Sequence, residues 1–517
     1  MSESIKKNSI TLGEFLYYLF FGSLLFAKGI GLYDGQTVFK LFLVFAVLCF
    51  GFKMLITAHT VREWVMIGFL LILGAVTYLV SGEKGALLYI MMITGLKNVP
   101  VKRVFYVGLV TWAVSFGGLF LLNATHLADS AFKVHDKMGM GTIRWSLGYA
   151  HPNVLHVSYL ILTIFIVYAL GKRFNWKWLL GLMIGNLYVF LYSVSYTGLL
   201  TVIFYLALNL YWHFRKKLAK PESFLIQLCM PVFVLFSLLA PVVLTGKAFD
   251  LFNKITNTRM ELSQRFLTTV PHTLFGVRIA EYITDRVTMD SSYVFAYITY
   301  GIVLFILIIA GYFWIIRKYC REQKGTELSI LLSTLLAGIT EPFLFNTSFK
   351  NVGLLFFGEI LFKDNQKKKI GFLTGLNQSR EISLPQTAKW NRFFARIKQN
   401  RTKIVIALIS GFLSGVLLYG AVINGSGTAV FFGGSNTQEL IEQLYTGQSS
   451  GAAGKILQYI AASDGDLALT REVIVLEWTR GIVTGGILLA ALFAGILCVK
   501  IYFAKQGQNK ERQQGKR

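Results

Sequence analysis

The chain has few cysteines and few acidic residues for its length, and each shortage excludes a class of protein. Four of its 517 residues are cysteine, and these four fall inside long apolar stretches or at their ends. An extracellular disulfide framework therefore has no cysteines to build it. The sequence also contains no P-loop, no dinucleotide-binding glycine motif and no HExxH motif. Nothing in it predicts a metal site, a cofactor or ATP-driven transport.

Long apolar runs are what the chain has instead. Hydrophobic residues make up 54% of it and the mean hydropathy is +0.57. This composition fits a helical membrane bundle, because in lipid each span must satisfy its own backbone polar groups. The runs lack the period of two that a membrane β-barrel needs. We expect an all-α polytopic membrane protein with about fourteen transmembrane helices, at residues 12–33, 36–56, 63–80, 84–97, 104–122, 152–170, 176–195, 197–213, 223–245, 291–316, 327–346, 349–362, 403–423 and 480–503.

Basic residues, 51 Lys and Arg against 26 Asp and Glu, gather in every second connection between these runs. Placing the N-terminus inside the cell puts all the basic connections in the cytoplasm, as the positive-inside rule requires. Both termini are then cytoplasmic. Charges scattered over short juxtamembrane loops favour anionic membrane lipids as partners and argue against nucleic acid. The first run is too long for a signal-peptide core, so we expect an uncleaved span.

Four connections are long, and they suggest how the chain is organised. We expect a twelve-span body at 1–362 with outer loops at 123–150 and 246–290, a basic cytoplasmic linker at 363–402, a two-span extension at 403–503 with an outer loop at 424–479, and a basic cytoplasmic tail at 504–517. Within the second outer loop, the apolar residues of 251–269 share one face at 100° per residue, which predicts an interfacial helix. Arg259 falls within that apolar stripe and Arg265 at its border, so Arg259 either meets a lipid phosphate or snorkels to a headgroup.

Ionisable groups at the membrane edge are candidate functional residues because burying them is costly. His151 stands before Pro152 and Asn153 at the outer mouth of a span, where its imidazole either takes up a proton or caps the helix. Asp290 is a natural N-cap for the next outer helix start. Glu341, followed by Pro342, is the carboxylate of the eleventh span; it is either a base or a buried partner of an arginine.

Taken together, these outer residues point to one type of reaction. Arginine forks recognise phosphate through paired hydrogen bonds. A diphosphate leaving group needs such charge compensation in the transition state, and an attacking sugar hydroxyl needs a base within hydrogen-bond reach. The expected chemistry is glycosyl transfer from a lipid diphosphate outside the cytoplasm.

Three passages resemble the Wzy-type repeat-unit polymerases of Gram-positive capsule and exopolysaccharide pathways, which belong with the O-antigen polymerases and ligases. They are Arg144 to Asn153 (RWSLGYAHPN), Asp290 to Tyr293 with Tyr300-Gly301, and Glu341 to Asn346 (EPFLFN) with Asn351. The likeness covers about residues 10–362. One departure is Ser195-Tyr196-Thr197-Gly198, where many relatives have Ser-Arg-Thr-Gly, so that phosphate contact is missing or replaced.

The resemblance implies a multi-pass enzyme of a bacterial plasma membrane that polymerises undecaprenyl-diphosphate-linked repeat units on the extracytoplasmic face. It implies a metal-independent inverting glycosyltransferase that needs no cofactor, with a flippase and a chain-length regulator as further partners. Carried onto this chain, it assigns His151 or Glu341 as the base and Arg144, Arg259 and Arg265 to the diphosphate. The residues it assigns to the glycan are Asn153, Asp290, Tyr293, Asn346 and Asn351.

Two other functions stay open at this point. A lipid-linked oligosaccharide flippase also has twelve to fourteen spans, but it should show repeated halves and polar groups near the bilayer midplane. We find no convincing repeat, and the polar groups gather at the outer edge. A ligase of the same superfamily, which attaches finished glycan to another acceptor, is barely distinguishable from a polymerase by sequence.

Overall fold

The chain forms two compact units. The computed structural model describes residues 9–124, 132–137, 140–215, 217–284, 288–362, 369–379, 381–383, 395–425 and 467–503. Unit 2 comprises residues 9–131 and 145–382; unit 1 comprises residues 1–8, 132–144 and 383–517. Most of the expected loop 424–479 and the tail 504–517 lie outside the described residues, as does much of the linker 363–402.

Unit 2 is a bundle of helices. Its longer helices are α1 (Leu12–Gly29), α2 (Thr37–Ile56), α3 (Val61–Ser81), α5 (Val101–Ala124), α6 (Pro152–Leu170), α7 (Trp176–Ser193), α8 (Tyr196–Phe214), α9 (Lys220–Val243) and α12 (Ser292–Glu322). Their facing sides form one large core of buried aliphatic and aromatic side chains. Over the described part of both units, nine helices are long and apolar enough to cross a membrane. The protein is therefore mainly helical and its composition indicates a membrane-spanning protein, while the expected fourteen crossings and the sidedness of the ends stay predictions.

Several expected spans correspond to short helices. They are α4 (Gly85–Thr94), α13 (Gly325–Ala337) and α14 (Leu355–Leu361), with the 3-10 turns η3 (Pro342–Leu344) and η4 (Val352–Leu354) between the last two. The helix α4 has 10 residues, about 15 Å at 1.5 Å per residue, which is half of a bilayer core. The apolar composition of these runs continues through their turns, and for this reason the sequence alone reads each as one span.

Among the described residues there are three short strand pairs, of which two join segments that are distant in the chain and the third joins adjacent strands. The pairs are β1 (Ser9–Thr11) with β6 (Glu381–Ser383), β2 (His59–Thr60) with β5 (Lys369–Ile370), and β3 (Phe132–Lys137) with β4 (Met140–Trp145). In the second pair His59 faces Ile370 in an antiparallel register. The short helix α15 (Thr374–Ser379) follows, and its Asn377 Oδ1 accepts from the Gly13 amide at 2.9 Å. Part of the expected linker is thus built into unit 2.

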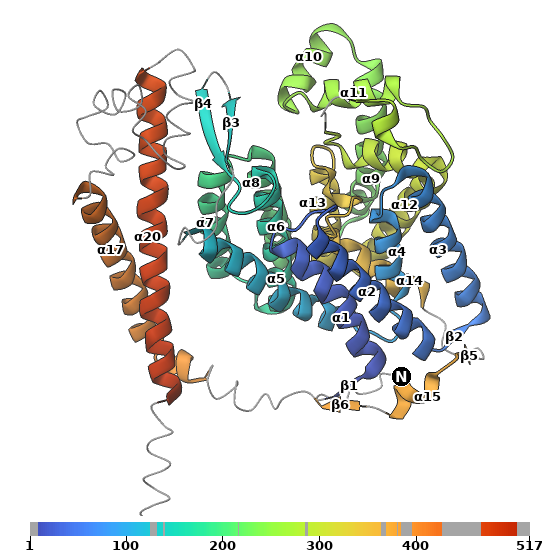
Figure 1. Cartoon of the computed structure of the whole chain (residues 1–517), viewed down its shortest axis with the longest axis horizontal. Coiled ribbons are helices and arrows are strands. Elements are labelled where there is room, and N and C mark those ends of the chain that lie inside the picture. The colour runs from blue at the N-terminus through green and yellow to red at the C-terminus, as the bar shows by residue number, and fades with distance from the viewer. Residues whose placement is uncertain are drawn as a thin grey trace, which may run out of the picture. The chain divides into compact units, whose positions relative to one another are not determined.

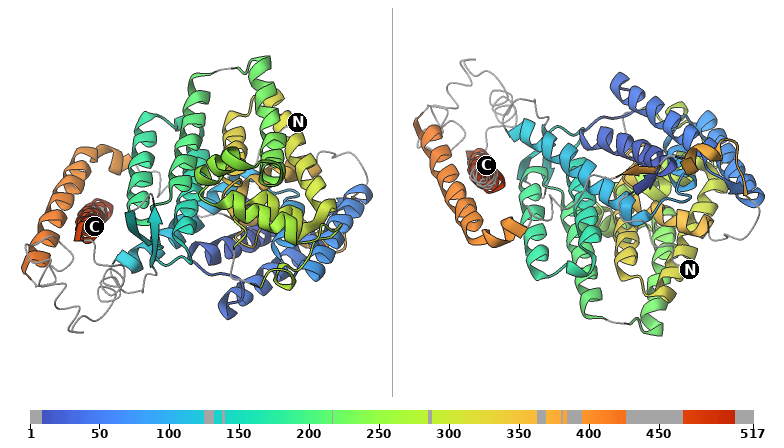
Figure 2. Two further views of the ribbon diagram at one scale, coloured as in Figure 1. Left: turned by 90° about the horizontal axis from the view of Figure 1, so that it is seen from above. Right: turned by 90° about the horizontal axis from the view of Figure 1, so that it is seen from below.

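The expected interfacial helix at 251–269 is instead two helices, α10 (Gly246–Ile255) and α11 (Arg259–Thr269). Asn257 and Thr258 between them have positive φ of 54° and 65°, which ends the first helix and turns the chain. The pair lies across one end of unit 2, while β2, β5 and α15 lie at the opposite end (Figures 1 and 2). The single apolar stripe expected from helical periodicity therefore ends at the break, and the residues beyond Asn257 face other directions than those expected.

A break at Gly301 interrupts α12. Gly301 has φ 77° and ψ 171°, a conformation that is open to glycine and costly for other residues. The freed amides of Ile302 and Val303 donate to the carbonyls of Thr273 and Leu274, at 3.0 and 3.2 Å. The loop that follows α11, and contains the 3-10 turn η2 (Ile279–Glu281), therefore completes the hydrogen bonding of α12. Irregular backbone among apolar spans is tolerated when it is satisfied in this way.

Unit 1 contains the expected extension as two helices, α17 (Arg401–Gly425) and α20 (Leu467–Phe503). Small residues let them approach closely: a Cβ added at Gly415 would lie 2.2 Å from the Gly485 carbonyl oxygen. Such small-residue contacts are typical of helix pairs in membranes. With 37 residues, α20 is about 55 Å long, so it extends well beyond a bilayer core. It begins inside the stretch that we expected to be an outer loop.

Candidate functional site

A buried arginine and a buried glutamate meet at the α10–α11 end of unit 2. Arg259 and Glu341 are 8% and 6% exposed, and the Arg259 Nη2 donates to Glu341 Oε1 at 3.3 Å. The Arg259 Nε also donates to the Thr340 carbonyl at 2.5 Å and lies 3.6 Å from Asp290 Oδ2. The Arg259 Nη1 donates to the Thr256 carbonyl at 3.2 Å, so the guanidinium is held by two carboxylates and two backbone carbonyls. A pair with so little exposure is stable only because each charge has its partner.

Local sequence explains how Glu341 reaches this position. The helix α13 ends at Ala337, and Pro342 disfavours helical geometry for the residue before it. Glu341 accordingly is extended, with φ −135° and ψ 135°. The Ser292 hydroxyl at the start of α12 donates to the Glu341 carbonyl at 2.5 Å and accepts from the Leu344 amide at 3.2 Å. These bonds fix the main chain on both sides of the carboxylate.

Two residues at the start of α6 also belong to this group of side chains. Asn153 Nδ2 donates to Glu341 Oε1 at 3.0 Å. His151 is the N-cap of α6, and its Nδ1 accepts from the Asn153 amide at 3.1 Å. Of the two roles open to His151 in the sequence, the structure displays the cap. The Nδ1 lone pair is already used for this bond, which leaves the imidazole in the tautomer protonated at Nε2.

Five of the candidate residues lie next to one another in the structure, and the two remaining arginines do not belong to this group. Glu341, Arg259, Asp290, Asn153 and His151 form one neighbourhood, which we call the Arg259–Glu341 cluster. Asp290 is not the N-cap of α12; Ser291 occupies that position. Arg265 is exposed on α11, the helix that Arg259 begins, and Arg144 is buried in β4, which belongs mainly to unit 1.

The remaining glycan candidates, Tyr293, Asn346 and Asn351, form hydrogen bonds outside the cluster. Tyr293 is fully buried and its hydroxyl donates to the Leu335 carbonyl at 2.7 Å. Asn351 is also fully buried; its Nδ2 donates to the Tyr312 hydroxyl at 2.7 Å and to the Leu344 carbonyl at 2.9 Å. Asn346 is half-buried, and its Oδ1 accepts from the Ser348 amide at 3.0 Å. Tyr293 and Asn351 are placed to organise the packing, whereas Asn346 retains some exposure.

A second buried cation lies near the cluster and was missed as a site residue by sequence reasoning. Lys350 is 3% exposed, and its Nζ donates to the Ser158 hydroxyl at 2.9 Å and the Val154 carbonyl at 3.4 Å. Both acceptors belong to α6, which also carries Asn153. In the sequence Lys350 looks like an ordinary basic residue at the end of a span. No local pattern distinguishes it, because its burial depends on α6.

A half-buried carboxylate on the α3–α4 connection is the other residue that the sequence did not single out. Glu83 Oε1 accepts from the amides of Gly85 and Thr347, at 3.2 and 2.9 Å. Burial raises the pKa of the Glu83 carboxyl, since a charge is costly away from water. The neighbouring Lys84 pairs with Asp34 at 2.8 Å. Because it accepts from the Gly85 amide of α4 and from the Thr347 amide, Glu83 links α4 to the loop after η3.

Ser193, which precedes the passage Ser195 to Gly198, is part of a buried network of polar side chains. His156 of α6 contacts Ser193 Oγ through Nδ1 at 2.9 Å and Asn186 Oδ1 through Nε2 at 2.8 Å. All three side chains are fully buried. The order resembles a nucleophile, a base and an orienting group, but the complete burial makes it a polar link between α6, α7 and α8. Tyr196, by contrast, is exposed.

Within the described residues, no group of three or more His, Cys, Asp and Glu is placed to hold a metal ion. Comparison of the chain with protein-family models, with curated proteins and with solved structures finds no match. The function therefore has to be argued from the residues and their geometry.

Proposed function

We propose that this protein is a glycosyltransferase that polymerises oligosaccharide repeat units carried on undecaprenyl diphosphate. The observation that supports this most is the Arg259–Glu341 cluster: a guanidinium, two carboxylates and an amide held together at one end of an apolar bundle. An anion-binding group and a base side by side are what transfer from a lipid diphosphate requires. The order of the passages resembling Wzy-type polymerases supports the same reaction.

The proposed reaction is a displacement at the anomeric carbon of the donor glycan. A hydroxyl of the acceptor repeat unit attacks that carbon, its proton passes to the base, and the bond from the carbon to the diphosphate oxygen breaks. Undecaprenyl diphosphate leaves with the bonding electron pair, and one glycosidic bond forms with inversion. Arg259 compensates the charge that develops on the leaving diphosphate, and Arg265, on the same helix, is the second phosphate contact.

Glu341 is a better choice for the base than His151 in this proposal. The Nδ1 of His151 already accepts the helix-capping bond, so a proton transfer there would break the cap. Glu341 has its carboxylate beside Arg259 and Asn153, where a sugar hydroxyl can replace one of these donors. In the resting state the Arg259 guanidinium is paired with the Glu341 carboxylate. A bound diphosphate would compete for the guanidinium and release the carboxylate to accept the proton of the sugar hydroxyl.

The proposed location is the plasma membrane of a bacterium, with the cluster on the extracytoplasmic side. Newly flipped repeat units are exposed on that side, and the basic connections of the positive-inside pattern lie at the opposite end of the bundle. Donor and acceptor both carry lipid anchors in this membrane, so they reach the cluster by lateral diffusion. A flippase that delivers the units and a chain-length regulator are the partners that this proposal requires or allows.

The test is the size and sidedness of lipid-linked glycan in a strain that lacks the protein. Single repeat units on the outer face, without long polymer, support a polymerase. Units confined to the inner face would mean a flippase, and long polymer that is not transferred to its final acceptor would mean a ligase. Complementation with Arg259→Gln or Glu341→Gln should fail to restore polymer, whereas Arg62→Gln, an exposed arginine at the opposite end, should restore it. Normal polymer from both cluster variants would overturn the assignment of the site.

A further inference from the structure

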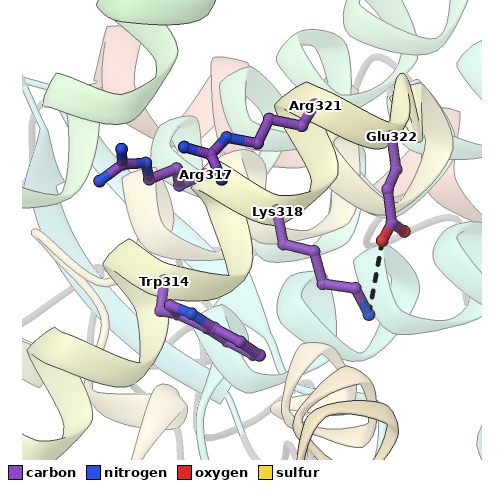
Figure 3. A pocket seen from close by; sticks show the side chains of 5 residues that line it. All are labelled: Trp314, Arg317, Lys318, Arg321 and Glu322. Atoms are coloured by element: carbon purple, nitrogen blue, oxygen red, sulfur yellow. Dashed lines mark ion pairs between the residues drawn. The ribbon is translucent and has the colours of Figure 1, made fainter. Parts of the chain in front are cut away.

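A basic groove lies at the end of α12 that is remote from the Arg259–Glu341 cluster. It has a volume of about 460 Å³ and is lined by Trp314, Arg317, Lys318, Arg321 and Glu322. Figure 3 shows Arg317 and Arg321 extending to one side of the helix, with Lys318 and Glu322 on the other. The start of α12 contacts Glu341 through Ser292, so the groove and the cluster lie at opposite ends of the same helix.

The carboxylates around the groove are already paired with lysines. Glu322 lies 3.9 Å from the Lys318 Nζ and 3.2 Å from the Lys324 Nζ. Glu359 lies 3.8 and 3.3 Å from the same two amines, and accepts from the Tyr319 hydroxyl at 3.2 Å. These contacts leave the local positive charge in excess.

The two arginines have no such partner. Among the described residues, no carboxylate lies within ion-pairing distance of either Arg317 or Arg321. Both are exposed and one helical turn apart, so their guanidinium groups can engage a single anion from two sides. Paired guanidinium donors of this kind recognise phosphate.

The same face of α12 changes from apolar to basic along its length. At 100° per residue, Ile306, Phe313 and Trp314 fall in the same arc of about 100° as Arg317 and Arg321. The first three are exposed apolar side chains, with 57%, 37% and 43% of their surface accessible. In a bilayer this face meets acyl chains in its middle and headgroups at its end. Tryptophan is the residue that favours that boundary.

We infer that this groove binds the headgroup of an anionic phospholipid. The phosphate lies between Arg317 and Arg321, Trp314 packs at the level of the glycerol backbone, and an acyl chain follows Phe313 and Ile306. The positive-inside pattern places this end on the cytoplasmic side, where the leaflet carries anionic lipid. The inference does not depend on the proposed enzymatic function, because it concerns the other end of the bundle.

Binding of lipid to the purified full-length protein tests the site. Titration with phosphatidylglycerol and with phosphatidylcholine, followed by native mass spectrometry, gives the preference of the protein for the anionic lipid. Replacing both arginines (R317Q/R321Q) should lower the affinity for phosphatidylglycerol by about tenfold to thirtyfold and leave that for phosphatidylcholine unchanged. Glutamine keeps the aliphatic part of each side chain and a polar end, and both positions are exposed, so we expect the fold to be retained.

A charge-matched control separates a site from general surface charge. Lys217 and Lys220 are exposed at the same end of the bundle, where the Leu218 amide donates to the Gln323 side chain at 2.7 Å. The control variant K217Q/K220Q removes the same charge and should keep the preference. Equal loss in the two variants, or no loss in R317Q/R321Q, would overturn the inference. Displacement of phosphatidylglycerol by millimolar inorganic phosphate would show a free-phosphate site and overturn the lipid assignment.

Discussion

At the scale of single residues, the position of Arg259 depends on two residues that precede it. The helical periodicity of 251–269 places this arginine in an apolar stripe against the lipid. Because Asn257 and Thr258 are left-handed, α11 begins anew and its first side chain turns inward to Glu341. Asparagine tolerates this conformation, so Thr-Asn-Thr was the available signal for a break. The partner, by contrast, is 82 residues away, and no single-sequence pattern connects such a pair.

Arg259 and Glu341 should be strongly coupled in stability. Replacing Arg259 by Met leaves a buried carboxylate without its main partner, at a cost of about 3–5 kcal/mol. The double variant R259M/E341Q lacks both charges of the Arg259–Glu341 pair and should be more stable than the sum of the single changes predicts. The free energies of unfolding of the wild type, the two single variants and the double variant, measured by denaturation in detergent, give the coupling energy of this double-mutant cycle. Additive effects would mean that the two groups do not interact.

His59 should make the stability of the protein depend on pH. Its ring is fully buried against Trp64 and Phe362, and burial, with Lys97 and Lys53 nearby, lowers its pKa from 6.5 to about 3. Glu63, 3.7 Å away, is already paired with Lys97. Between these two pKa values the unfolded chain binds a proton that the folded chain does not. The free energy of unfolding therefore decreases as the pH is lowered, by roughly 2–3 kcal/mol from pH 6.5 to pH 4.5.

The change that isolates this effect is His59→Phe, which keeps an aromatic ring in contact with Trp64 and cannot titrate. The melting temperature of wild type and H59F, measured across that pH range, should diverge as the pH falls, with the wild type losing more. Parallel curves for the two proteins would show that His59 does not contribute.

At the scale of elements, the sequence located most helices but not the short ones. Long apolar runs bounded by charge, such as α2 and α9, agree with the expected spans within a few residues. The runs at 84–97 and 327–346 are mainly apolar, with Glu341 as an exception in the second, yet α4 and α13 cover only part of them. Turns that are buried in protein need no polar residues, since neighbouring helices exclude water and satisfy their backbone. Hydropathy therefore cannot separate such turns from helix.

Glycine at 301 should be required for the contact between α12 and the loop after α11. An added Cβ would lie 2.3 Å from the Gly276 nitrogen and 2.5 Å from the Leu274 oxygen, at a φ of 77°. We expect Gly301→Ala to destabilise the protein by about 2 kcal/mol or more. Gly68 in α3 has nothing within 4 Å, and Gly68→Ala should be neutral or mildly stabilising. Thermal unfolding of both variants decides between strain at Gly301 and a general intolerance of alanine.

The pairing of α17 and α20 should likewise depend on a glycine. Leucine at position 415 would collide with the Gly485 carbonyl and push the helices apart, whereas Gly495 has nothing within 4 Å. The distance between spin labels on the two helices should increase in Gly415→Leu and stay constant in Gly495→Leu. An unchanged distance in the first variant would mean that the helices do not meet at Gly415.

At the scale of the whole molecule, the two ends of unit 2 differ in chemistry, and this difference predicts its orientation. The end with α10 and α11 carries the Arg259–Glu341 cluster, and the opposite end carries the basic connections. We expect a cysteine at Lys247 in α10 to react with a membrane-impermeant maleimide in intact cells. A cysteine at Lys217 should react only after permeabilisation. Both lysines are exposed, and labelling in the reverse order would invert the orientation and remove the proposed function.

The break in α12 also bears on how the protein is made. The carbonyls of Thr273 and Leu274 are synthesised before the amides of Ile302 and Val303 that bind them. A nascent chain therefore contains both acceptors before α12 is complete. We expect the loop to satisfy the two amides as the span inserts, so that they need not be exposed to lipid.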